Sequence, residues 1–96
     1  MIERLDGAAR IDALAKIPAW REAEGRDAIT RELAFEDFSE AFDFLTQIAL
    51  YAERADHHPE LYNVYSRVVV TLTTHDAGGI SQRDIEMACF IDGLLP

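Results

Sequence analysis

Residues 38–54, FSEAFDFLTQIALYAER, carry the strongest periodic pattern in the chain. Their apolar side chains recur in steps of three and four, the spacing of one face of an α-helix. Asp37, followed three residues later by Glu40, forms a capping-box pattern at the start. Pro59 lies just beyond the end and disfavours helical backbone in the residue before it. The pattern predicts a long helix over 38–54. Its apolar face consists of Phe38, Ala41, Phe42, Leu45, Ile48, Ala49 and Ala52.

Three further apolar side chains of this stretch, Phe44, Leu50 and Tyr51, fall outside that face. Single exposed apolar residues are common on protein surfaces, but three on one helix indicate a contact between subunits. We therefore expect a homodimer or a homotetramer. A foreign protein partner is the alternative occupant of the same surface.

The segment after the long helix predicts a β-hairpin. A strand can begin within residues 62–66, and Arg67–Thr74 shows the clearest alternation in the chain, which is a strand signal. Val68, Val70 and Leu72 point to one side of that strand, which is therefore the side expected to face the core.

The last part of the chain predicts a loop and a helix. Residues 76–79 contain two glycines and form the loop. Ser81 then caps the helix in a second capping-box pattern with Asp84, and Gly93 ends it. Its shared face consists of Ile85, Ala88, Cys89 and Asp92.

The segment before the long helix predicts a short helix and another hairpin. Residues 7–16 form the helix, with Asp6 as its N-cap and Pro18 preventing its continuation. Residues 19–35 form the hairpin, with its turn at residues 24–27. The apolar face of the short helix consists of Ala8, Ile11, Leu14 and Ala15.

The predicted elements follow the order α-β-β-α-β-β-α. Helices placed between hairpins favour an α+β fold, in which a four-stranded antiparallel sheet has helices packed on one face. The chain has 96 residues, of which 49% are hydrophobic. This is enough for one core, so we expect residues 1–96 to form a single domain.

The charge balance excludes several classes of partner. The chain has 18 Asp and Glu residues against 9 Lys and Arg residues, a net charge of −9. Binding to a phosphate backbone or to an anionic membrane needs clustered cations, so we expect neither direct nucleic-acid contact nor membrane contact. The apolar runs are also far shorter than the about 20 residues of a membrane-spanning helix.

The single cysteine, Cys89, rules out an internal disulfide and a Cys-x-x-Cys zinc site. The first residues, Met-Ile-Glu-Arg-Leu-Asp, are charged and show no signal peptide. Both features favour a reducing, cytoplasmic location.

Three histidines are the candidate chemical groups. His57 and His58 follow the long helix, and His75 follows the strongest strand. Imidazoles gathered in one pocket can exchange protons or hold a metal, but their spacing matches no common zinc site. Acid–base chemistry fits better, with Glu53 or Asp56 orienting a ring. The alternatives are solvated loop histidines and ordinary surface acids.

The same residues resemble the signature of the pterin-4a-carbinolamine dehydratase family. The similar stretch runs from Glu53 through Asp56-His57-His58-Pro59. It continues at the family's spacing with Tyr65, Thr73-Thr74-His75 and Asp84. The similarity covers nearly the whole chain from about Leu14 onward, and the spacing from the histidine pair to Thr74-His75 is highly specific.

The resemblance implies an enzyme that removes water from 4a-hydroxytetrahydropterin to give quinonoid dihydropterin. This reaction serves tetrahydrobiopterin recycling beside aromatic amino-acid hydroxylases, and the family uses no metal and no tightly bound cofactor. Animal members of the family also act as dimerisation partners of a transcription factor. A protein-interaction module is therefore the alternative function, with a hydroxylase or a regulator as the candidate partner.

The resemblance also implies the residues of the site. The catalytic residues are His57, His58 and His75. The substrate-binding residues are Glu53, Asp56, Pro59, Thr73, Thr74 and Asp84, although the capping position of Asp84 explains it without any catalytic task. One departure from the family is Leu61, which stands where tryptophan is common and removes an aromatic wall from the site.

The dehydration itself needs one proton delivered to the leaving hydroxyl and one removed from a ring nitrogen. A charged and a neutral imidazole can divide these tasks. We expect His58 and His75 to be this pair, because Pro59 restricts the backbone of His58 and a strand precedes His75. His57 ends a helix, so we expect it to be the least fixed and to act mainly in binding.

Overall fold

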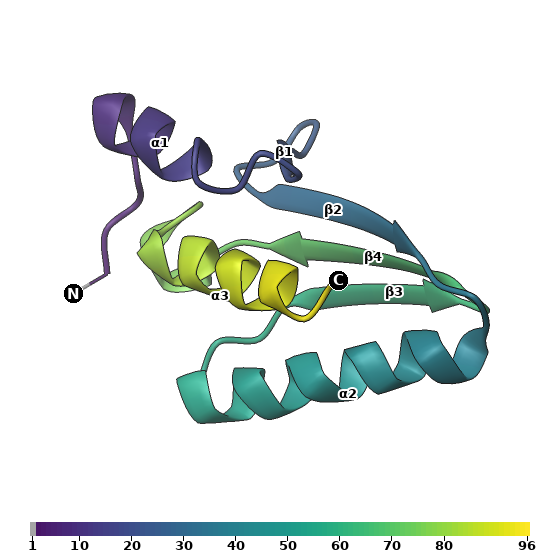
Figure 1. The fold of residues 1–96 in the computed structure, drawn as a ribbon. Helices are drawn as coiled ribbons and strands as arrows, with labels where there is room; N and C mark the ends of the chain where they lie inside the picture. Colours follow the sequence, from purple (N-terminus) through teal and green to yellow (C-terminus); the bar gives the residue numbers. More distant parts are fainter. Residues whose placement is uncertain (1) are drawn as a thin grey trace.

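Four antiparallel strands form one sheet in the order β1-β2-β4-β3 (Figure 1). The computed structural model describes residues 2–96. The expected element order and the α+β class are confirmed, with one short 3₁₀ helix, η1, added. The elements are α1 (Gly7–Leu14), β1 (Arg21–Glu22), β2 (Ile29–Ala34), α2 (Phe38–Ala55), β3 (Glu60–Val64), β4 (Arg67–Leu72), η1 (His75–Ala77) and α3 (Gln82–Gly93).

The second hairpin differs from the prediction at both of its strands. β3 begins at Glu60, earlier than the predicted 62–66, and ends at Val64. Tyr65 then adopts a left-handed conformation with φ of 50° and starts the tight turn into β4. A turn of this kind needs positive φ, and the side-chain alternation of a strand carries no signal for it.

β4 ends at Leu72 rather than at Thr74 because the next two residues bond elsewhere. The Thr73 hydroxyl donates to the carbonyl oxygen of Asp27 over 2.8 Å. Thr74 forms an isolated bridge with Gly79 instead of continuing the ladder with β2. The chain therefore leaves the sheet at this point, and both threonines lie where η1 begins.

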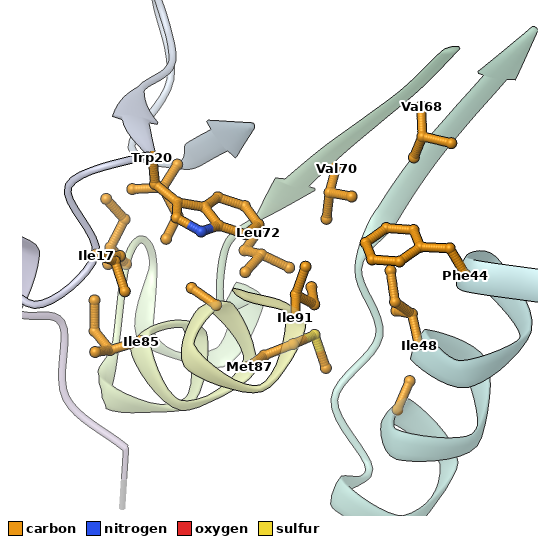
Figure 2. Packing of buried hydrophobic residues seen from close by; sticks show 14 of the residues in the cluster. Ile17, Trp20, Phe44, Ile48, Val68, Val70, Leu72, Ile85, Met87 and Ile91 are labelled. Atoms are coloured by element: carbon orange, nitrogen blue, oxygen red, sulfur yellow. The ribbon is translucent and has the colours of Figure 1, made fainter. Parts of the chain in front are cut away.

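One face of the sheet forms the core, as the alternation in β4 predicted. Val68, Val70 and Leu72 are fully buried. Side chains from α2 and α3 pack against them, as Figure 2 shows for Phe44 and Ile91. Burial of each large aliphatic side chain contributes about 1.5–3 kcal/mol, so this layer holds the helices on the sheet.

The buried face of α2 differs from the predicted face. Ala41, Ile48 and Ala52 are buried as expected, but Phe44, predicted to lie outside, completes that line, and its ring lies 4.9 Å from that of Phe35. Phe38 and Phe42, predicted to be in the core, are about half exposed, and Ala49 is exposed. The helix carries apolar residues around most of its circumference, and only its contact line with the sheet selects the buried ones.

In the two shorter helices, α1 and α3, the buried residues also differ from those predicted. In α1, Ala13 is buried while Ile11 is exposed, and the Asp6 side chain makes no capping hydrogen bond. In α3, the capping box of Ser81 and Asp84 is confirmed, but Cys89 is exposed. The remaining predicted residues divide as follows: Ala8 and Ala15 are exposed, Leu14 and Asp92 are half-buried, and Ile85 and Ala88 are buried. Within residues 2–96, every helix is too short or too polar to span a bilayer.

Candidate active site

A cavity of about 270 Å³ is lined by residues from the end of α2, the start of β3, the segment after β4, η1 and the start of α3. All three histidines line it, although they come from segments on either side of the β3–β4 hairpin. The antiparallel hairpin explains this, because it returns the chain to the level where it left α2. The lining residues are Asp56, His57, His58, Glu60, Thr73, Thr74, His75, Asp76 and Arg83.

His57 is the most firmly held of the three histidines. Its Nε2 lies 2.6 Å from Oδ1 of Asp84. Its backbone N–H donates to the carbonyl oxygen of Ala52 over 3.1 Å. The residue is buried at 8% exposure. The expectation that His57 is the least fixed residue is therefore wrong, because its partner lies 27 residues ahead in the sequence and only the folded chain brings the two together.

Asp84 is fully buried and lies directly behind the cavity. Its second carboxylate oxygen accepts hydrogen bonds from the Thr74 hydroxyl at 2.7 Å and the Ser81 backbone N–H at 2.9 Å. The carboxylate therefore has a partner for each oxygen, which a buried charge requires. Because an ionised carboxylate can only accept, Nε2 of His57 is the donor in this contact.

His58 makes an equally short contact in different surroundings. Its Nε2 lies 2.6 Å from Oε2 of Glu53, and both side chains are more than half exposed. The sequence placed Glu53 one helical turn before His57, but the structure pairs it with His58. Asp56, in a left-handed conformation with φ of 51°, ends α2, so His57 and His58 lie beyond the helix and the helical spacing from Glu53 does not apply to them.

His75 opens η1 on the other side of the cavity and is exposed. The loop that carries it is closed at its base by two backbone hydrogen bonds between Thr74 and Gly79, of 3.0 and 3.2 Å. Gly78 ends η1 with φ of 75°, a conformation that favours glycine. The backbone of this loop, rather than a contact of the imidazole, determines where His75 lies.

Three lining residues were not predicted from the sequence. Asp76 follows His75, Glu60 is the first residue of β3, and Arg83 lies in the first turn of α3. The hydrogen bond from Arg26 lowers the pKa of Glu60, against its partial burial, so this carboxyl stays ionised. Only their position in the sequence could have indicated them, because each lies next to or near a predicted site residue.

Three of the predicted substrate-binding residues do not line the cavity. Glu53 reaches the site through His58, and Asp84 reaches it through His57. Pro59 and the departing residue Leu61 also lie outside the lining. Within residues 2–96 no cluster of three or more His, Cys, Asp or Glu side chains is arranged to hold a metal ion.

The lining of the cavity is rich in polar groups. The ring nitrogens of its three imidazoles can donate or accept hydrogen bonds. Hydroxyl groups of Thr73 and Thr74 supply further hydrogen-bonding partners. Fold and site together define a small α+β protein with a cavity lined by three histidines.

The chain belongs to the pterin 4 alpha carbinolamine dehydratase family, whose model matches residues 3–94. A relative from Rhodopseudomonas palustris (strain HaA2), named as a pterin-4-alpha-carbinolamine dehydratase, is 57% identical over 98% of this chain and 93% of its own length. A relative with the same name from Bradyrhizobium sp. (strain BTAi1) is 54% identical over 98% of this chain and 95% of its own.

Two solved structures resemble the fold. A transcriptional coactivator/pterin dehydratase from Brucella melitensis has a TM-score of 0.93 and 46% identity, covering 98% of this chain and all of its own. A pterin dehydratase-like RuBisCO assembly factor of the alpha-carboxysome has a TM-score of 0.67 and 23% identity, covering 79% of this chain and 88% of its own. The second shares the fold alone.

Proposed function

We propose that this chain dehydrates 4a-hydroxytetrahydropterin to quinonoid dihydropterin by histidine acid–base catalysis. The C4a–O bond breaks, a C=N bond forms, one proton joins the leaving hydroxyl and one leaves a ring nitrogen, so that the net change is loss of water. The observation that carries this proposal is that His57, His58 and His75 line one cavity in a member of this family.

His57 is the best candidate for the proton acceptor. A base must be held within roughly 0.5 Å of its working position, and the contact with Asp84 fixes both the ring and its tautomer. The buried carboxylate would also stabilise the imidazolium that forms when Nδ1 takes the ring-nitrogen proton, as in other His–Asp pairs. This assigns proton transfer to a residue that the sequence had linked mainly to binding.

His58 and His75 are the candidates for the proton donor. Both are exposed, so bulk water can return a proton to them after each turnover. Glu53 lies 2.6 Å from Nε2 of His58 and can orient that ring. Asp56, Thr73 and Thr74 line the same cavity and can bind polar edges of the pterin ring.

The substrate we expect is the carbinolamine of tetrahydrobiopterin, in a recycling pathway beside an aromatic amino-acid hydroxylase. The test is a dehydration assay on freshly generated 4a-hydroxytetrahydropterin, followed by ultraviolet absorbance. Turnover well above the spontaneous rate supports the proposal, and turnover should survive prolonged treatment with EDTA. A rate equal to the spontaneous one, or activity that only zinc restores, would contradict it.

We also propose self-association through the outer face of α2. Phe38 and Phe42 are about half exposed with their rings 5.5 Å apart, and Leu50 is 60% exposed further along the helix. Phe44, one of the residues first linked to this contact, is buried and does not contribute. Sedimentation should show a dimer or a tetramer that Phe42→Asp dissociates, and a 10.8 kDa monomer at micromolar concentration would contradict this.

A pure protein-interaction function is the second candidate for the same surface. The exposed phenylalanines favour it, but it gives no role to the three histidines that line one cavity. Dehydration by the Phe42→Asp variant at an unchanged rate per chain would separate the two functions. A cytoplasmic location stays a prediction that rests on the cysteine content.

A further inference from the structure

Asp27 lies outside the cavity, in the turn between β1 and β2, yet it contacts both ends of the loop that carries His75. Its backbone carbonyl accepts the Thr73 hydroxyl over 2.8 Å, on the segment that enters the loop. Its carboxylate Oδ1 accepts the backbone N–H of Ile80 over 3.2 Å, on the segment that leaves it. Asp27 therefore contacts the chain both before and after the loop that contains His75.

The carboxylate is itself held by two arginines of the N-terminal segment. Arg10, on α1, places Nη1 2.9 Å from Oδ1 of Asp27, and Arg4 places Nη1 3.7 Å from Oδ2. Arg10 is largely buried and also donates to the carbonyl oxygen of Leu5 over 3.1 Å. These contacts connect the N-terminal segment with the loop of the site.

The packing around Asp27 leaves no room for a side chain at the base of the loop. A Cβ atom at Gly79 would lie 2.5 Å from Oδ2 of Asp27 and 2.8 Å from the Arg4 side chain. Partial burial raises the pKa of Asp27, but the Ile80 N–H and the guanidinium groups of Arg10 and Arg4 outweigh it and lower the pKa overall. The carboxylate is thus a tightly surrounded anion.

We infer that Asp27 is a positioning residue that sets the place of His75 in the active site, an inference that rests on the proposed function. Among residues 2–96 no side chain is hydrogen-bonded to the His75 ring, so its position depends on the backbone of its loop. Asp27 joins both ends of that loop to α1. His57 and His58 have carboxylate partners of their own and do not depend on it.

The test is Asp27→Asn, made in the wild-type chain and in the His75→Ala chain. A displaced catalytic group loses rate steeply, so we expect kcat to fall about 10-fold in the wild-type background. In the His75→Ala background the same change should lower kcat by less than about 2-fold, because the residue it positions is absent. Equal loss in both backgrounds would overturn the inference, since general destabilisation acts in both.

Asp12→Asn is the matched control, because Asp12 is exposed on α1 and its replacement removes the same charge. It should leave kcat unchanged in both backgrounds. If Asp27→Asn does not fold, Arg10→Gln replaces it, since this change keeps the carboxylate but removes its nearest guanidinium. Arg10→Gln should show the same dependence on His75 with a smaller loss, and an equal loss in both backgrounds would again overturn the inference.

A second measurement does not depend on activity. The imidazole resonances of His75 in a ¹H–¹³C NMR spectrum should shift in Asp27→Asn, while those of His58 stay in place. Unchanged His75 resonances would overturn the positioning role. A wild-type protein that lacks dehydratase activity but shows the His75 shift would instead contradict the proposed function and leave the structural link supported.

Discussion

Two neighbouring histidines make contacts of the same length in opposite surroundings. His57 Nε2 lies 2.6 Å from Asp84, and His58 Nε2 lies 2.6 Å from Glu53. Asp84 is fully buried, whereas Glu53 is 76% exposed. Water can replace either partner of the exposed pair and screens its charges, but it cannot reach Asp84. Burial, and not distance, therefore decides what each contact contributes.

The largest expected effect is on stability when His57 is removed. His57→Ala leaves the Asp84 carboxylate buried with one oxygen unpaired, and breaking a buried pair in this way costs about 3–5 kcal/mol. His58→Ala is the matched variant and should change the free energy of unfolding by less than about 1 kcal/mol, because Glu53 stays solvated. Urea denaturation measures both, and similar losses would remove the distinction between the pairs.

Catalysis should separate from stability at the same position. His57→Gln can still donate a hydrogen bond to Asp84 but cannot take up a proton near neutral pH. We expect it to recover part of the stability lost in His57→Ala while kcat stays lower than wild type by about 10²-fold or more. Measured kcat and unfolding curves decide this, and a His57→Gln enzyme with wild-type kcat would show that His57 serves structure only.

Double-mutant cycles compare the two contacts directly. We expect a coupling energy of about 2 kcal/mol between His57 and Asp84, within the range for buried contacting residues. The coupling between His58 and Glu53 should be about 0.5 kcal/mol, as for exposed ion pairs. The cycles use alanine at all four positions and the free energy of unfolding, and a larger coupling at the exposed pair would reverse our ranking.

Asp27 is a third carboxylate, 28% exposed and so between the two extremes. Because its pKa is lower in the folded chain than in the unfolded chain, the unfolded state binds the proton first. Its stabilisation is therefore present above the unfolded pKa of about 3.9 and is lost as pH falls through the lower folded pKa. The difference in melting temperature between wild type and Asp27→Asn should narrow below that pH. A constant difference would contradict the pKa shift.

The smallest effect concerns salt at the exposed pair. The Debye length falls to about 3 Å at 1 M salt, so screening should weaken the attraction between the exposed side chains of His58 and Glu53. The melting temperature of Glu53→Gln should be slightly lower than that of wild type in dilute buffer, and the difference should shrink in 1 M NaCl. A difference of the same size in high salt would place this pair closer to the buried one in behaviour.

Much of the fold followed from local patterns. The alternation of Val68, Val70 and Leu72 predicted the buried face of β4, because a strand has only two faces. The choice of face on α2 failed at Phe44, because a helix with apolar residues on most sides offers several similar faces. Which one meets the sheet depends on partners such as Phe35, and no local pattern contains that information.

The site was predictable in its members but not in its geometry. Family spacing pointed to the three histidines and to Asp84, and the capping box gave Asp84 a reason of its own. That the same carboxylate both caps α3 and holds His57 follows only from the packing of α3 against the end of α2. The contribution of Asp27 was also hidden, since it lies in a turn far from the histidines in sequence.

Among residues 2–96, two residues other than glycine have a positive φ: Asp56 and Tyr65. Replacing a residue strained in this way is one route to higher thermal stability. A left-handed conformation costs a side chain of order 1 kcal/mol. Asp56 lines the cavity, so relieving its strain would alter the site. Tyr65 lies in the β3–β4 turn, at the opposite end of the hairpin, where asparagine adopts this conformation more readily. Tyr65 is therefore the position to change for higher thermal stability, and Asp56 is the one to keep.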